Sequence, residues 1–144
     1  MFPEHILTVR ATVDAGHEAE FNRWYDREHV PDALRLLPGC LGAARYRVVE
    51  GDGSHQYMAV YAFPSQAALG RALHGDEIQE LIRRYDQAVG AFSTRGRTTY
   101  ARILERPGSP SRPVRRRRRP ASPRRRGGSA GGPAAGRGRG RAAR

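Results

Sequence analysis

The chain has 144 residues, and its 26 arginines and 14 acidic residues give it a formal net charge of +12. This charge is unevenly distributed, because residues 107–144 hold 13 arginines and no acid, whereas residues 1–106 have a net charge of −1. The basic excess therefore says nothing about the first 106 residues, which have an ordinary globular composition. The single cysteine, Cys40, excludes an intrachain disulfide and a multi-cysteine metal site.

The same features set expectations for the location of the protein. One cysteine is compatible with a reducing cytoplasm, and residues 1–10 lack the basic start and apolar run of a signal peptide. No apolar run approaches the ~20 residues that a membrane-spanning helix needs. We therefore expect a cytoplasmic protein with one folded domain over residues 1–106.

The first elements in chain order are a strand and a helix. Residues 4–13 are apolar and β-branched, which is typical of a strand. Aromatic residues at helical spacing then predict a helix over residues 16–29, with acidic residues in its first turn. Because Pro31 lacks an N–H, we expect the helix to end there and a new turn to cover residues 31–37.

The remaining predicted elements are two strands, a helical segment and a fourth strand. Residues 41–50 and 56–63 predict two strands joined by a hairpin at 51–55. Apolar positions at i, i+3, i+4 and i+7 predict helix from residue 65 to about 89, with a pause at Gly75, and residues 97–105 predict a fourth strand. The order β-α-β-β-α-β predicts an α+β, ferredoxin-like sandwich, with a four-stranded antiparallel sheet in the order 4-1-3-2.

The third strand predicts a partner for the sheet. In this fold both helices cover one face, so the other face should alternate to polar residues. Residues 57–63 are apolar on both faces, with Met58, Val60 and Ala62 on one and Tyr57, Ala59, Tyr61 and Phe63 on the other. We therefore expect a homodimer in which the two sheets pack face to face.

Residues 24–32, WYDREHVPD, are the segment that carries candidate chemistry. On a helix Asp26 and His29 are i, i+3 neighbours, and Tyr25 and His29 are i, i+4 neighbours. A histidine beside a carboxylate is a minimal general acid/base pair, because the carboxylate fixes the tautomer and raises the imidazole pKa. A neighbouring tyrosine can donate to a developing oxyanion.

A structural interpretation of the same segment stays open. His29 would lie in the last turn before Pro31, where a cationic imidazole favours the helix dipole, and Trp24 would be a core residue. A metal site is not expected, because His29 has no second histidine at i+4 and the other four histidines are scattered.

The run EFNRWYDREHVPDALRLLPGCLGAARY resembles the EthD-like branch of the dimeric α+β-barrel superfamily. In those sequences a W-Y-D-x-E-H-[VLI]-P segment on the first helix precedes a P-G pair and a strand that ends in an aromatic or basic residue. The matching residues are Trp24, Tyr25, Asp26, Glu28, His29, Pro31, Pro38, Gly39 and Tyr46. The resemblance covers about residues 4–105.

The resemblance implies a ferredoxin-like protomer with a cleft between its sheet and its helices. It implies small-molecule acid/base chemistry without metal or cofactor, such as cyclisation, dehydration or decarboxylation of an apolar or aromatic polyketide-like metabolite of secondary metabolism. A cofactor-independent monooxygenase and a non-catalytic ligand-binding protein are the alternatives. The candidate catalytic residues are His29, Asp26 and Tyr25, and the candidate substrate-binding residues are Trp24, Tyr46 and Tyr61.

Residues 107–144 consist almost entirely of Arg, Gly, Pro, Ala and Ser and cannot form a core. This composition predicts disorder. Three interpretations stay open: a solvated extension that reflects a GC-rich genome, a non-specific binder of nucleic acid or another polyanion, and a regulatory tail. Since aromatic residues for base stacking are absent from this segment, any such binding would be electrostatic and salt-sensitive.

Overall fold

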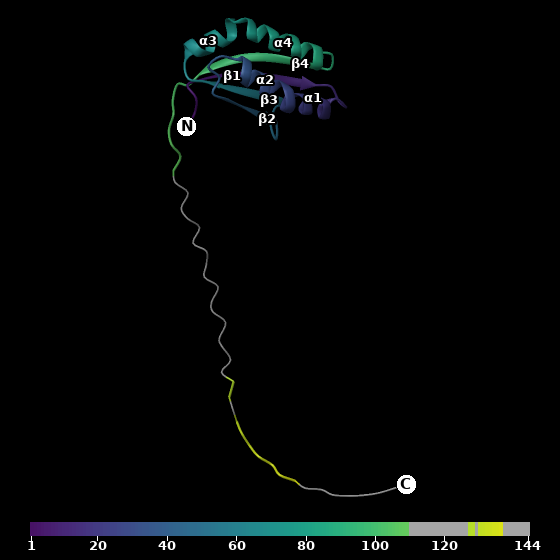
Figure 1. Cartoon of the computed structure of the whole chain (residues 1–144), viewed down its shortest axis with the longest axis vertical. Coiled ribbons are helices and arrows are strands. Elements are labelled where there is room, and N and C mark those ends of the chain that lie inside the picture. Colours follow the sequence, from purple (N-terminus) through teal and green to yellow (C-terminus); the bar gives the residue numbers. More distant parts are fainter. Residues whose placement is uncertain (110–126, 129, 137–144) are drawn as a thin grey trace, which may run out of the picture. The chain divides into compact units, whose positions relative to one another are not determined.

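The computed structural model describes residues 1–109, 127–128 and 130–136 of the chain. Contacts divide the chain into two units, Met1–Pro107 and Gly108–Arg144. The elements of the first unit are β1 (His5–Val13), α1 (Glu18–Trp24), η1 (Tyr25–His29), α2 (Val30–Leu36), β2 (Gly42–Arg47), β3 (Tyr57–Phe63), α3 (Gln66–His74), α4 (Asp76–Ala88) and β4 (Ser93–Ala101) (Figure 1). The described residues of the second unit form no helix or strand. Most of residues 107–144, for which the sequence predicts disorder, lie outside the described residues.

The sheet has four antiparallel strands in the order β2-β3-β1-β4, which confirms the predicted topology. Cross-strand partners point to the same face of an antiparallel sheet, so the register sorts the side chains into two sets. Leu7 lies opposite Tyr61, and Ala11 opposite Tyr57 and Arg95, on the face that the helices cover. The core lies on this face, between the strands and the helices.

The first helical segment departs from the expectation in an informative way. The chain does not leave the helix at Pro31. Instead η1 is a π-helical turn, in which the N–H of Val30 donates to the carbonyl of Tyr25, and α2 follows with Pro31 in its first turn. A proline ring inside an α-helix collides with the carbonyl four residues earlier, and a widened turn relieves this collision. The continuous helical path keeps His29 inside the fold rather than at a helix end.

The fourth strand also differs from the expectation. β4 spans Ser93–Ala101 rather than residues 97–105, and Ser93 pairs with Val13 at the far end of β1. Ile103 and Leu104, whose apolar character favoured the later position, are 98% and 68% exposed. The earlier start places Arg95 within the strand and on the covered face.

The helices α3 and α4 are separated at Gly75, as expected. Ser65 caps α3, because its hydroxyl accepts a hydrogen bond from the N–H of Ala68 at 3.1 Å. The amphipathic α4 buries Ile78, Leu81 and Tyr85. None of the helices in the described part of the chain is long and apolar enough to cross a membrane.

Candidate functional site

A cavity of about 250 Å³ lies between the sheet and the helices. An engineered cavity of roughly 150 Å³ holds benzene, so this one has room for more than a single aromatic ring. β1, β3 and β4 form its floor, and η1, α2 and α4 form its roof. It is lined by Leu7, Val9, Tyr25, His29, Ala33, Leu37, Tyr61, Ile78, Leu81, Ile82, Tyr85, Arg95 and Arg97.

His29 lies in the cavity wall within a group of aromatic rings. Its imidazole stacks on Trp24 at 4.8 Å, and it meets Tyr25 and Tyr85 edge-on at 4.8 Å and 6.0 Å. Burial lowers the pKa of His29 to about 4; Asp32 opposes this shift and Arg95 adds to it. The imidazole is therefore neutral at pH 7, which argues against the interpretation of His29 as a cationic helix cap.

Two buried polar atoms in this wall are poorly satisfied by the protein. The Nδ1 atom of His29 makes no hydrogen bond to any described residue. The hydroxyl of Tyr61 has no well-formed hydrogen bond, although it lies close enough to the hydroxyl of Tyr25 to interact with it. Leaving a buried donor or acceptor unpaired costs about 1–3 kcal/mol, so such atoms are rare and call for an explanation. Both belong to residues that line the same cavity, where a bound molecule could supply the partner.

The phenols beside His29 remain protonated over the physiological range. Burial raises the pKa of Tyr25 to about 12, and it raises the pKa of Tyr61 further. The guanidinium of Arg45 lies 4.5 Å from the centre of the Tyr25 ring and fixes that side chain from the sheet. Tyr25 and Tyr61 can therefore act as hydrogen-bond donors to a ligand but not as bases.

The expected pair between Asp26 and His29 is not formed. The carboxylate of Asp26 accepts a hydrogen bond from Arg45 at 2.6 Å, and its side chain is 62% exposed. The wider π-helical turn changes the i, i+3 geometry on which that expectation rested. Of the candidate residues, Tyr25, His29 and Tyr61 line the cavity together, whereas Asp26 does not.

Trp24 and Tyr46, expected at the substrate, also lie elsewhere. Trp24 stacks against the imidazole of His29 and lines a separate surface groove with Arg84 and Pro31. Tyr46 is 55% exposed, and its register with Met58 places it on the uncovered face of the sheet. Of the six candidate residues, three line this cavity (Tyr25, His29 and Tyr61) and three do not (Trp24, Asp26 and Tyr46).

Several wall residues were not foreseen as part of a site. The spacing of Ile78, Leu81, Ile82 and Tyr85 indicated only the buried side of a helix, and Arg95 fell before the expected fourth strand. The alternation of Ser93, Arg95 and Arg97 is the signal that could have placed these arginines on one face.

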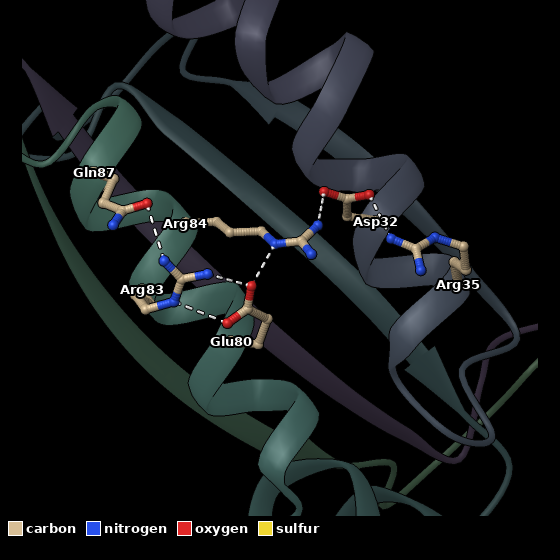
Figure 2. A network of polar contacts seen from close by, with 6 residues as sticks. All are labelled: Asp32, Arg35, Glu80, Arg83, Arg84 and Gln87. Atoms are coloured by element: carbon tan, nitrogen blue, oxygen red, sulfur yellow. Dashed lines mark hydrogen bonds and ion pairs between the residues drawn. The ribbon is translucent and has the colours of Figure 1, made fainter.

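An ion-pair network ties the two roof helices together (Figure 2). Arg84 of α4 contacts Asp32 of α2 at 2.7 Å and Glu80 of its own helix at 2.9 Å. Partial burial opposes ionisation of Asp32, but Arg35 and Arg84 together outweigh it and lower its pKa. Hydrogen bonds from Arg83 and Arg84 lower the pKa of Glu80 to about 2. This network holds α4 beside α2 on the outer side of the cavity roof.

The described residues contain no group of three His, Cys, Asp or Glu side chains arranged to hold a metal ion. The site instead combines a neutral imidazole, buried phenols, two guanidinium groups and an aliphatic floor and roof. Such a wall can hold an apolar molecule and exchange a proton or a hydrogen bond with it.

The architecture and the position of this cavity define a ferredoxin-like α+β protein of the type found in dimeric α+β barrels. Residues 4–98 match the family described as a domain of unknown function, DUF4286, and the chain belongs to this family. No curated protein matches the sequence.

Solved structures with the same fold are consistent with the EthD-like resemblance. An EthD-family protein from Bacillus halodurans is 16% identical, with a TM-score of 0.51 over 65% of this chain and 96% of that one. SnoaB from Streptomyces nogalater, a cofactor-independent oxygenase, is 20% identical, with a TM-score of 0.52 over 73% and 99%. MhuD from Mycobacterium tuberculosis, a haem degrader solved with two haems in its active site, is 20% identical, with a TM-score of 0.53 over 72% and 99%. Identities this low show a shared fold.

Proposed function

We propose that the domain binds an apolar, ring-bearing small molecule in the cavity and that His29 moves a proton on it. The observation that carries this proposal is that His29 Nδ1 has no hydrogen-bond partner and the Tyr61 hydroxyl has no well-formed one, in the wall of one cavity lined mainly by aliphatic and aromatic side chains. A ligand phenol would satisfy both atoms, because its O–H can donate to Nδ1 and its oxygen can accept from the Tyr61 hydroxyl. A ketone oxygen would accept from Tyr61 and leave Nδ1 free to take a proton from the neighbouring carbon. In either case the ring would pack against Leu81 and Ile82.

The neutral state of His29 suits the role of proton acceptor. At pH 7 an imidazole with a pKa near 4 is neutral, so one of its ring nitrogens has a free lone pair that can accept a proton, although it is a weak base. An enolate or phenolate forming beside it would raise its pKa, because a nearby negative charge stabilises the imidazolium. Arg95, whose charge already acts on His29, would stabilise the same negative charge from the floor.

An enolate is the intermediate that the candidate reactions share. Cyclisation and dehydration of a polyketide-like molecule form it by loss of a proton next to a ketone, whereas decarboxylation of a β-keto acid forms it by loss of CO₂ and ends with the uptake of a proton. We place these three reactions first. Cofactor-free oxygenation, in which the carbanion reacts with O₂, is the alternative, and the structural similarity to SnoaB supports it.

A ligand carrier without turnover is the second candidate function. The observation that favours it is the separation of Asp26 from His29, since Asp26 is bound to Arg45 instead. Without a carboxylate on the imidazole, His29 lacks the partner that usually orients and strengthens a histidine base.

Replacing His29 with alanine is expected to reduce turnover by about 10²-fold or more, which is the usual contribution of a general base. The wild-type protein would be incubated with aromatic β-ketones and with 1,8-dihydroxyanthrone, with and without O₂, and the products followed by absorbance and mass spectrometry. His17→Ala is the matched control, because His17 lies outside the cavity and its side chain is 47% exposed. Equal turnover by the wild type and His29→Ala would reject the assignment, and binding without product would favour the carrier.

We also propose that the domain forms a homodimer through the uncovered face of the sheet. Around Val60 this face is largely apolar, and Tyr46 and Tyr100 are 55% and 43% exposed on it. Thr8 and Ala44 lie directly beside Val60 in the register, which places Val60 near the centre of the face. A second copy of the sheet would remove this apolar surface from water.

The basic tail supports a third, separate activity. Residues 107–144 carry 13 arginines and no acid, so we expect weak, sequence-independent binding of nucleic acid that decreases steeply with salt. Gel shifts with the full chain and with residues 1–107, at low and physiological salt, test this expectation. The full chain should bind only at the lower salt and the truncated chain at neither, whereas binding by residues 1–107 or no binding at all would contradict it.

A further inference from the structure

The floor of the cavity ends at two arginines on the edge strand β4. Arg95 lies opposite Ala11 and Arg97 opposite Val9, so both guanidinium side chains leave the sheet on the face that the helices cover. Both line the cavity, whereas the surrounding wall is mainly aliphatic and aromatic. A charged group in such a wall identifies the polar end of whatever the cavity holds.

The two arginines differ in what already binds them. Arg95 donates to Asp86 at 2.8 Å, and its guanidinium lies 4.1 Å from the centre of the Tyr85 ring. Arg97 makes no hydrogen bond or ion pair with any described residue. No aspartate or glutamate follows Glu105 in the sequence. Arg97 is thus a cation at the cavity rim without a partner from the described fold.

Among the cavity-lining residues, Arg97 is the cation that remains free to bind an anionic group of a ligand. Burial keeps the imidazole uncharged at pH 7, and Arg95 is already paired with Asp86. A guanidinium binds a carboxylate through two parallel hydrogen bonds, a geometry that neither a ketone nor an amide reproduces. The same rim charge would add little for a neutral ligand.

We propose that the cavity takes aromatic or alicyclic carboxylic acids, with the ring against Leu81 and Ile82 and the carboxylate on Arg97. This inference rests on the proposed ligand-binding function and adds the substrate class to it. The ring lies innermost, because the lining there consists mainly of aliphatic and aromatic side chains. Arg97, which is exposed, keeps the carboxylate at the solvent end. Arg97 is therefore a specificity-determining residue rather than a catalytic one.

The test compares two probes of nearly equal shape, 2-naphthoate and 2-naphthamide, by isothermal titration calorimetry of the full chain at pH 7. Wild-type protein should bind the naphthoate about tenfold more tightly, the ratio expected from one charge-assisted hydrogen-bonded pair. Arg97→Gln should bind both probes equally. Arg102→Gln is the matched control and should keep the preference, because Arg102 lies outside the cavity and pairs with Glu105 and the carbonyl of Phe2. The tail arginines are present in all three proteins, so they cannot produce the difference.

The outcomes separate this inference from the function on which it rests. Equal binding of both probes by the wild type would overturn the carboxylate preference and leave the ligand site standing. A preference that persists in Arg97→Gln would overturn the assignment to Arg97. Failure of both probes to bind would overturn the ligand site itself, and the inference with it.

Discussion

Replacing Val60 with aspartate is expected to convert the protein from a dimer into a monomer. Val60 lies in the central strand β3, on the face away from the helices, between Thr8 and Ala44. A carboxylate buried there without a partner costs about 3–5 kcal/mol in each protomer, so association should weaken by at least about two to four orders of magnitude. In the isolated protomer this carboxylate would face water, so the fold should survive.

Sedimentation velocity at micromolar concentration measures this change directly. Ala67→Asp is the matched control, because it places the same charge on the exposed side of α3, away from the uncovered face of the sheet. The control should stay dimeric, and circular dichroism should show all three proteins to be folded. A monomeric wild type would contradict the proposed dimer, and a Val60→Asp protein that remains dimeric would place the interface elsewhere.

His29 is expected to make stability fall as the pH is lowered from about 6.5 to about 4. Its pKa is lowered to about 4 in the folded chain, whereas the unfolded chain keeps a pKa near 6.5. Between these values the unfolded chain binds more protons, so acid favours unfolding. The full stabilisation is present above pH 6.5, and about 3 kcal/mol is lost once the pH has fallen through 4.

The comparison is between wild-type protein and His29→Phe, which keeps a ring in contact with Trp24 and Tyr25. Urea unfolding at one fixed protein concentration would be measured at pH 7 and pH 4. Carboxylates such as Glu80 lose stabilisation in acid in both proteins, so the difference between the two isolates His29. The wild type should lose about 3 kcal/mol more than His29→Phe. Equal losses of unfolding free energy in the two proteins would mean that folding does not lower the pKa of His29.

The sheet was predictable because its signals are local and redundant. Apolar and β-branched residues marked the first and third strands. The β-α-β-β-α-β succession predicted the strand order, and the charged residues of the edge strands agree with it. The fourth strand was predicted too late in the sequence, because the apolar residues Ile103 and Leu104 favoured a later position. The observed strand begins at Ser93 and ends before both of them. The position of β4 is determined by its pairing with β1, and the sequence of residues 93–105 alone contains little information about that pairing.

The site was only partly predictable for a related reason. His29 and Tyr25 follow from their spacing and from the EthD-like motif, and Tyr61 follows from its strand. The π-helical turn could not be read from Pro31 alone, because a proline can end a helix or widen it. That choice separates Asp26 from His29. The roles of Arg95 and Arg97 depend on contacts between β4 and α4 that are distant in sequence.

A crystal structure of the full chain soaked with 6-hydroxy-2-naphthoate tests the central claim most directly. We predict the ring in the cavity between the sheet and α4, the carboxylate toward Arg97, and the ligand hydroxyl within hydrogen-bonding distance of His29 Nδ1 or the Tyr61 hydroxyl. Ligand bound outside the cavity, or a cavity that stays closed by side chains at saturating ligand, would contradict the proposal that this domain acts on a small molecule there.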